Sequence, residues 1–191
     1  MPRALALLIL GCLFVVFPAT AGAETSPTGG AQFSDPAPIV APGAKATLLP
    51  DGTAAAPAEA PLEVQQAIFA ANKLLDKPYK YGGGHAKVED SGYDCSGTVS
   101  YAMLAAGVLK SPLDSSGFMR WGLKGKGAWI TVFSNPGHAY AVIAGLRLDT
   151  SVAGVRARAA RQFERVTERG PRWRPGKRKM RGFRARHPLG L

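Results

Sequence analysis

Cysteine is scarce in this chain of 191 residues, which holds only Cys12 and Cys95. Cys12 lies in an apolar N-terminal run, so Cys95 has no partner for an internal disulfide. The few histidines, which lie far apart, lack the spacing of a zinc site. The glycines at 82–84 are not followed by the Gly-Lys-Ser/Thr of a phosphate-binding loop. We therefore expect no metal, no cofactor and a free thiol at Cys95. The histidines are His85, His138 and His187.

The N-terminal residues 1–23 have the pattern of a cleaved secretory signal peptide. Arg3 precedes two apolar runs, and Ala21-Gly22-Ala23 has the small-x-small form of a cleavage site. We expect a secreted, periplasmic or cell-envelope protein. Lipid anchoring at Cys12 is the alternative, because Ile9-Leu10-Gly11-Cys12 resembles a lipobox.

Large apolar side chains are few in residues 24–60, which are rich in Ala, Pro, Gly, Thr and Ser. Such a segment buries too little surface to offset its ordering entropy, so we expect a disordered linker there. Residues 61–155 are expected to form one small domain, and the protein is expected to be a monomer.

Acidic residues are nearly absent from the C-terminal part of the chain. Residues 156–191 hold 13 Lys/Arg and 2 Asp/Glu, whereas residues 1–155 hold 11 of each, so the formal charge of +11 lies in this basic C-terminal extension. Because Trp173 and Phe183 stand among its arginines, we expect it to pack on the domain with these aromatics as anchors. The alternative is a patch that binds anionic wall polymers or lipid headgroups, and no specific nucleic acid is expected.

Two helices are predicted before any strand of the domain. An apolar stripe at helical spacing predicts a helix from Pro61 to about Asp76. A second helix is predicted from Cys95 to Gly107, with Asp94 as its N-cap. A thiol at a helix N-terminus is favoured as the thiolate, and the free N–H groups there are suited to an oxyanion hole.

Three antiparallel strands are predicted after the helices, over residues 129–133, 138–143 and 146–150, which makes the fold class α+β. A two-residue loop at Ala144-Gly145 gives opposed residues an index sum of 289, so His138 and Asp149 share a face as diagonal neighbours. A slip of one residue would bring Thr150 to that face instead. The ring of His138 needs such a polar group to fix its tautomer.

Three motifs resemble the NlpC/P60 family of cell-wall cysteine peptidases: Lys77-Pro-Tyr-Lys-Tyr-Gly-Gly83, Tyr93-Asp-Cys-Ser-Gly-Thr-Val99, and Gly137-His138 before an apolar strand. The resemblance covers about residues 62–151 and implies a compact papain-like fold. It also implies Cys95 as nucleophile, His138 as base and Asp149 as the third polar group. By the same resemblance, Tyr79 shapes the oxyanion site, and Asp94 and Ser96 engage the substrate.

The activity that this resemblance implies is hydrolysis of an amide bond in peptidoglycan stem peptides, typically the γ-D-glutamyl bond to a diamino acid. Two alternatives stay open at this point. One is a non-catalytic protein that binds the cell wall or a polyanion on a peptidase-like scaffold. The other is a Cys-dependent amidase or acyltransferase with the same thiol and histidine.

Overall fold

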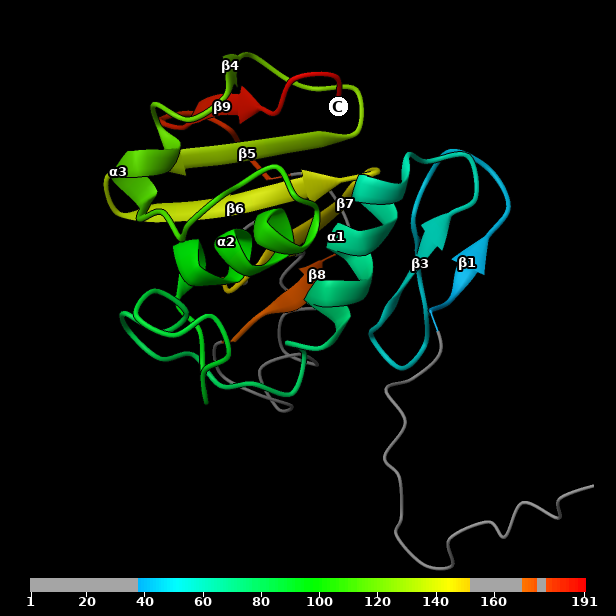
Figure 1. The fold of residues 1–191 in the computed structure, drawn as a ribbon, viewed down its shortest axis with the longest axis horizontal. Coiled ribbons are helices and arrows are strands. Elements are labelled where there is room, and N and C mark those ends of the chain that lie inside the picture. The colour runs from blue at the N-terminus through cyan, green and yellow to red at the C-terminus, as the bar shows by residue number, and fades with distance from the viewer. Residues whose placement is uncertain (1–37, 152–169, 175–177) are drawn as a thin grey trace, which may run out of the picture. The chain divides into compact units, whose positions relative to one another are not determined.

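The computed structural model describes residues 38–151, 170–174 and 178–191, and these form an α+β fold (Figure 1). The expected signal peptide, including Cys12, lies outside the described residues. In the described part of the chain, no helix has both the length and the apolar character needed to cross a bilayer. The helices are α1 (Leu62–Asn72), α2 (Cys95–Ala105) and α3 (Ser115–Phe118).

The larger sheet is antiparallel throughout, with the strand order β4-β9-β5-β6-β7-β8. Its central strands follow one another along the chain, whereas β8 and β9 come from the arginine-rich C-terminal region. The strands are β4 (Leu123–Lys124), β5 (Ile130–Asn135), β6 (His138–Ile143), β7 (Leu146–Asp149), β8 (Arg172–Arg174) and β9 (Arg184–His187).

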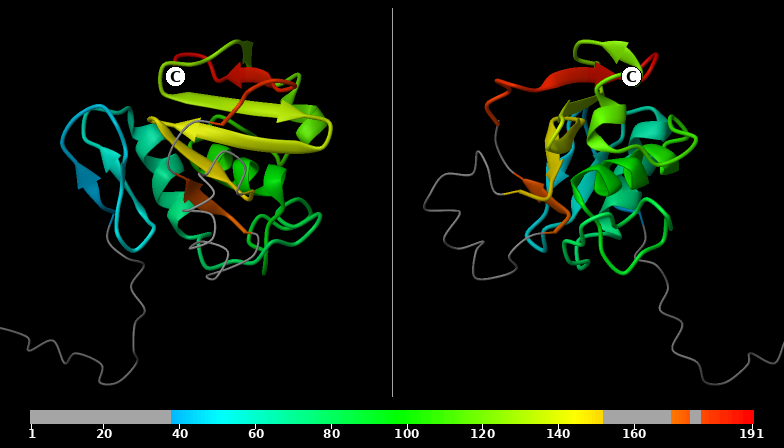
Figure 2. Two further views of the ribbon diagram at one scale, coloured as in Figure 1. Left: turned by 180° about the vertical axis from the view of Figure 1, so that it is seen from behind. Right: turned by 90° about the vertical axis from the view of Figure 1, so that its left-hand side faces the viewer.

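Helices α1 and α2 pack on one face of this sheet, as the side view in Figure 2 shows. Residues Cys95–Met103 of α2 are all buried, as expected for a helix that is enclosed on every side. The core between helices and sheet is apolar and includes Val64, Ile68, Val99, Met103, Ile130, Val132, Ala141, Ile143 and Leu148. This packing fixes the N-terminus of α2 against the start of β6.

The predicted register of the central hairpin is confirmed. Ile143 pairs with Leu146 and Ala141 with Leu148, so opposed residues have the index sum expected for a two-residue loop. Ala144 (φ 46°) and Gly145 (φ 91°) form that loop with positive φ at both positions, which suits the twist of a tight hairpin.

The expected disordered linker is wrong for residues 38–60. They form a three-stranded sheet of β1 (Val40–Ala41), β2 (Thr47–Leu48) and β3 (Ala54–Pro57), in the order β1-β3-β2. Small side chains let β3 pack closely on α1, and Ala54 and Ala56 are fully buried. The Asn72 side chain also accepts a hydrogen bond from the Ala54 N–H and donates one to its carbonyl, both at 2.9 Å. Residues 24–37 lie outside the described residues.

The expected domain boundary after residue 155 is also wrong, because β8 and β9 are strands of the main sheet. β8 pairs with β7, and β9 lies between β4 and β5. Trp173 is buried in the core, and its indole N–H donates to Asn72 Oδ1 at 2.8 Å. The described part of the C-terminal extension, residues 170–174 and 178–191, therefore packs on the domain and also completes its sheet.

Candidate active site

The N-terminus of α2 is capped as the sequence predicts. Asp94 has an extended backbone, and its Oδ1 accepts a hydrogen bond from the Gly97 N–H at 2.7 Å. Its main-chain carbonyl accepts from the Thr98 hydroxyl, also at 2.7 Å. Because the first N–H groups of a helix point out of its N-terminal end and have no intrahelical acceptor, Cys95 lies in a region of partial positive charge.

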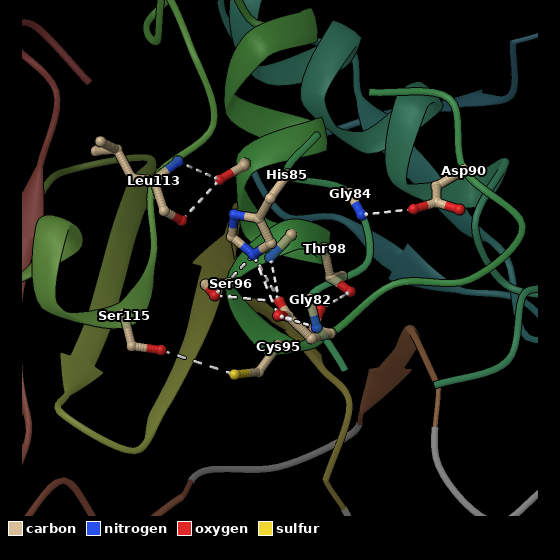
Figure 3. A network of polar contacts seen from close by, with 12 residues as sticks. Gly82, Gly84, His85, Asp90, Cys95, Ser96, Thr98, Leu113 and Ser115 are labelled. Atoms are coloured by element: carbon tan, nitrogen blue, oxygen red, sulfur yellow. Dashed lines mark hydrogen bonds and ion pairs between the residues drawn. The ribbon is translucent and has the colours of Figure 1, made fainter. Parts of the chain in front are cut away.

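A second histidine lies at this helix start, which the sequence did not predict. His85 Nε2 contacts Asp94 Oδ1 at 3.0 Å and Oδ2 at 3.1 Å, and the Ser96 hydroxyl at 3.3 Å (Figure 3). The Gly82 N–H donates to Asp94 Oδ2 at 3.1 Å. These contacts hold residues 82–85 against the first turn of α2.

Asp94 and Ser96 lie beside the thiol, as the family resemblance implies, but their side chains bond within the protein. Asp94 is 8% exposed and Ser96 4% exposed. The Ser96 hydroxyl donates to Asp94 Oδ1 at 3.1 Å. In this structure the two side chains belong to the scaffold that positions the helix start.

Glycines allow this close approach of loop and helix. A Cβ at Gly97 would collide with the main-chain carbonyl of Gly83. Gly84 has φ +82°, and a Cβ there would lie 2.6 Å from the Tyr93 ring. The Gly-rich turn that the sequence shows is therefore a packing surface for α2.

Cys95 is a free thiol, 8% exposed, and its partner is the ring of His138. Burial raises the pKa of the thiol, but hydrogen bonds and charge from His138, together with the Ala139 backbone and the Ser115 hydroxyl, outweigh burial and lower that pKa below its usual value. The Ser115 hydroxyl lies 3.8 Å from Sγ (Figure 3). The thiol is therefore placed in surroundings that favour the thiolate.

His138 begins β6 and joins the thiol to a carboxylate. Its Nε2 lies 2.9 Å from Asp149 Oδ1, which leaves Nδ1 for the thiol. Burial lowers the pKa of the ring, but Asp149 and Cys95 outweigh burial and raise that pKa to about 9. At neutral pH the ring is therefore an imidazolium, paired with a thiol that favours ionisation.

Asp149, rather than Thr150, lies against the ring, which confirms the predicted register at this point. The carboxyl is 1% exposed. Burial opposes its ionisation, but His138, the Ser151 N–H at 2.9 Å and Arg147 outweigh burial and lower its pKa. Asp149 is therefore a carboxylate that fixes the orientation and charge of the ring.

Arg178, from the C-terminal extension, holds the other oxygen of this carboxylate. Its Nη1 donates to Asp149 Oδ2 at 2.9 Å and to the Ser151 hydroxyl at 2.7 Å. Its guanidinium lies over the rings of Tyr140 and Phe183, at 5.1 and 4.9 Å from their centroids. No pattern in the sequence distinguishes this arginine from the many others near it.

Tyr79 pairs through its backbone with Tyr93, two residues before Cys95. This places the motif 77–83 alongside the segment that leads into α2. His187, by contrast, lies on β9, where Nδ1 contacts the Gly125 carbonyl at 3.2 Å, and it belongs to the sheet rather than to the site. Among the described residues, no three His, Cys, Asp or Glu side chains gather in a way that would hold a metal ion.

A scan against protein-family models finds no family that matches the sequence, and a search of curated proteins finds no match.

Proposed function

We propose that this protein is a cysteine peptidase that hydrolyses an amide bond in peptidoglycan stem peptides, with an NlpC/P60-type papain-like fold. The observation that carries the proposal is the arrangement of Cys95 at a helix N-terminus, against a His138 ring that Asp149 holds at 2.9 Å. A nucleophile, a base and a group that orients the base are the parts that thiol-based acyl transfer needs.

Acylation starts from the ion pair of thiolate and imidazolium. Cys95 Sγ attacks the amide carbon, and the carbonyl oxygen becomes an oxyanion close to the N–H groups at the start of α2. His138 Nδ1 then donates its proton to the nitrogen of the leaving amine. The C–N bond breaks, the amine departs and a thioester to Cys95 forms.

Deacylation uses the histidine in its neutral form. His138 takes a proton from water, whose oxygen adds to the thioester carbon, and a second oxyanion forms in the same place. The C–S bond breaks and releases the acid, while the thiolate and the imidazolium are restored. Asp149 stays ionised throughout and keeps Nδ1 directed at the reacting atoms.

The choice of substrate rests on the sequence motifs rather than on the catalytic geometry. The segments 77–83 and 93–99 lie together, and within the NlpC/P60 pattern they flank the site that receives a stem peptide. Tyr79 is assigned to shaping the oxyanion site on the same ground. A location in the cell envelope belongs to this proposal, because residues 1–23 resemble a signal peptide.

The test is digestion of purified sacculi by the full chain, with mass spectrometry of the released peptides. We expect cleavage at one amide bond of the stem, and none with Cys95→Ala. Iodoacetamide at neutral pH should label Cys95 and abolish cleavage. If Cys95→Ala digests sacculi as well as the wild type does, the proposal is wrong.

The same digestion separates the two alternative functions. Binding to sacculi that leaves every bond intact would indicate a wall-binding protein on a peptidase-like scaffold. With an added amine acceptor, a new amide product in place of the free acid would indicate an acyltransferase, since both reactions share the thioester.

A further inference from the structure

A cavity of about 470 Å³ opens on the face of the main sheet that is turned away from α1 and α2. The left view of Figure 2 looks toward this face. Cys95, His138 and Asp149 are not among the residues that line it, but the lining residues Arg147 and Arg178 lie against Asp149, so the cavity borders the thiol site. The lining residues are Lys126, Gly127, Ala128, Trp129, Thr131, Phe133, Tyr140, Val142, Gly145, Arg147, Arg178 and Met180.

The polar lining of this cavity is positively charged. Lys126, Arg147 and Arg178 contribute three cations, and no Asp or Glu is among the lining residues that the structure describes. Walls with one sign of charge and low polarisability raise the local concentration of ligands of the opposite sign. The ligand that suits the cavity is therefore an anion.

Arg147 is the strongest reason to expect such a ligand. Its side chain is 1% exposed, and all three guanidinium nitrogens lack a hydrogen-bond partner in the structure that is described. A buried guanidinium without hydrogen bonds is costly, because it has lost its water and gained nothing in exchange.

Asp149 does not supply what Arg147 lacks. The distance from Arg147 Nε to Asp149 Oδ2 is 3.5 Å, and the carboxylate is already hydrogen-bonded to His138, Ser151 and Arg178. The single negative charge thus faces two arginines and an imidazolium. One further anion beside Arg147 would balance this charge and satisfy the free N–H groups.

The rest of the wall is apolar and aromatic. Trp129, Phe133 and Tyr140 line the cavity together with Val142 and Met180. The rings of Phe133 and Tyr140 stack with their centroids 5.0 Å apart, which gives one wall a flat surface. The volume lies within the range of cavities that hold small organic ligands.

We propose that this cavity is a binding site for a small organic carboxylate, whose anionic group pairs with Arg147 and Lys126 and whose apolar body lies against Trp129 and Phe133. This site goes beyond the proposed peptidase activity and does not depend on it. Arg178 links the two sites physically, since it lines the cavity and also bonds to Asp149.

The test is titration of the full chain with benzoate, followed by calorimetry and by the NMR signal of the Trp129 indole. Benzamide, which has the same shape and no charge, is the matched ligand control, and inorganic phosphate is an anion without an apolar body. We expect benzoate to bind and to shift the Trp129 signal, with benzamide and phosphate each at least about tenfold weaker. Equal binding of benzoate and benzamide, or no binding of benzoate, would overturn the proposal.

Two substitutions test whether benzoate binds in this cavity. Arg147→Met keeps an unbranched apolar stem, removes the guanidinium and should weaken benzoate binding about tenfold or more, while Lys126→Gln should weaken it about threefold. Lys124→Gln is the matched control, because Lys124 is exposed on β4 and is absent from the cavity lining. If Arg147→Met does not fold, Lys126→Gln alone decides, since Lys126 is exposed.

Neither the benzoate titration nor the comparison of the substituted proteins depends on catalysis. Cys95→Ala should bind benzoate as tightly as the wild type does, whether or not the protein cleaves sacculi. Unchanged affinity in Arg147→Met and Lys126→Gln would place the ligand elsewhere and would contradict the assignment.

Discussion

Two histidine–carboxylate pairs flank Cys95, and their geometry is nearly the same. His138 Nε2 lies 2.9 Å from Asp149, and His85 Nε2 lies 3.0 Å from Asp94. They differ in what the other atoms of each pair contact. The ring of His138 reaches the thiol, whereas His85 uses the same Nε2 for Asp94 and for the Ser96 hydroxyl.

The carboxylates differ in the same way. Asp94 accepts hydrogen bonds from the N–H groups of Gly82 and Gly97, and so ties a loop to a helix start. Asp149 is buried and is shared by His138 and Arg178. A short contact between histidine and carboxylate therefore does not identify a catalytic pair, and the next contact along each chain of hydrogen bonds decides its role.

The largest difference is expected when the two rings are removed in turn. His138→Ala should lower the rate of stem-peptide cleavage by about 10²- to 10⁴-fold, because the base and the charge partner of the thiolate are both lost. His85→Ala should keep the rate within about threefold of wild type, because its ring bonds to the scaffold. The measurement is the initial rate of peptide release from sacculi. Equal losses in the two variants would show that the pairs are not distinct.

Exchanging each carboxylate for an amide tests whether Asp149 and Asp94 have different roles. Asp149→Asn should lower the cleavage rate about 10²-fold or more, since an amide no longer stabilises the imidazolium. Asp94→Asn should have a small effect on the rate, because Asn is as good an N-cap as Asp. Circular dichroism and a urea titration of both variants check that each is folded.

The pH dependence of thiol alkylation sharpens the assignment of the ion pair. The pKa of Cys95 is lowered and that of His138 is raised to about 9, so iodoacetamide should react fast at pH 7 and a second change should appear near pH 9. In His138→Ala the thiol loses the partner that lowers its pKa while burial still raises it. Its rate at pH 7 should then fall about tenfold or more and should rise only at higher pH.

The raised pKa of His138 also makes the free energy of unfolding depend on pH. Because the pKa of His138 is raised from 6.5, its protonation stabilises the folded state fully below pH 6.5, and this contribution is lost as pH rises through about 9. The difference in unfolding free energy between wild type and His138→Ala should therefore shrink across that range. A constant difference would contradict the ion pair.

Arg178 acts on the reaction through Asp149, so a moderate effect is expected. Arg178→Gln should lower kcat about three- to tenfold with KM nearly unchanged, and Arg178→Lys should restore most of the loss. Arg181→Gln is the control, because Arg181 is exposed. A role that is only structural would lower the melting temperature without this split between kcat and KM and without rescue by lysine.

The smallest effect is expected from Ser115. Its hydroxyl lies 3.8 Å from Sγ, which is long for a hydrogen bond, so Ser115→Ala should lower the alkylation rate at pH 7 by about twofold. Ser116→Ala, the neighbouring position, is the control. A loss comparable with that of His138→Ala would require Ser115 to be part of the machinery.

The parts of the site that the sequence predicted are those set by local rules. Asp94 at a cap position and an apolar helix after it fix Cys95 at the start of α2. A two-residue loop fixes the register of β6 and β7, and this register alone brings His138 and Asp149 to one face. Both the helix start and the strand register are set by residues that lie close together in the sequence.

The parts that the sequence did not predict depend on contacts between distant residues. Strands β8 and β9 are short and alternate with arginine, so no apolar pattern marked them, and their partners lie far away along the chain. His85 reaches Asp94 because the glycines of its turn fold back onto α2. The alanines of β3 are too small to signal burial in a composition, yet Ala54–Ala56 are buried on α1.

The position of Arg178 near the C-terminus has a consequence for the order in which the protein assembles. Ribosomes synthesise Cys95, His138 and Asp149 before Arg178. They also synthesise these three residues before strand β8, which pairs with β7, and strand β9, which pairs with β5. A nascent chain therefore carries the thiol before it carries the residues that complete the surrounding sheet. The sheet around the thiol and the second contact of Asp149 are therefore complete only after the C-terminal segment has emerged.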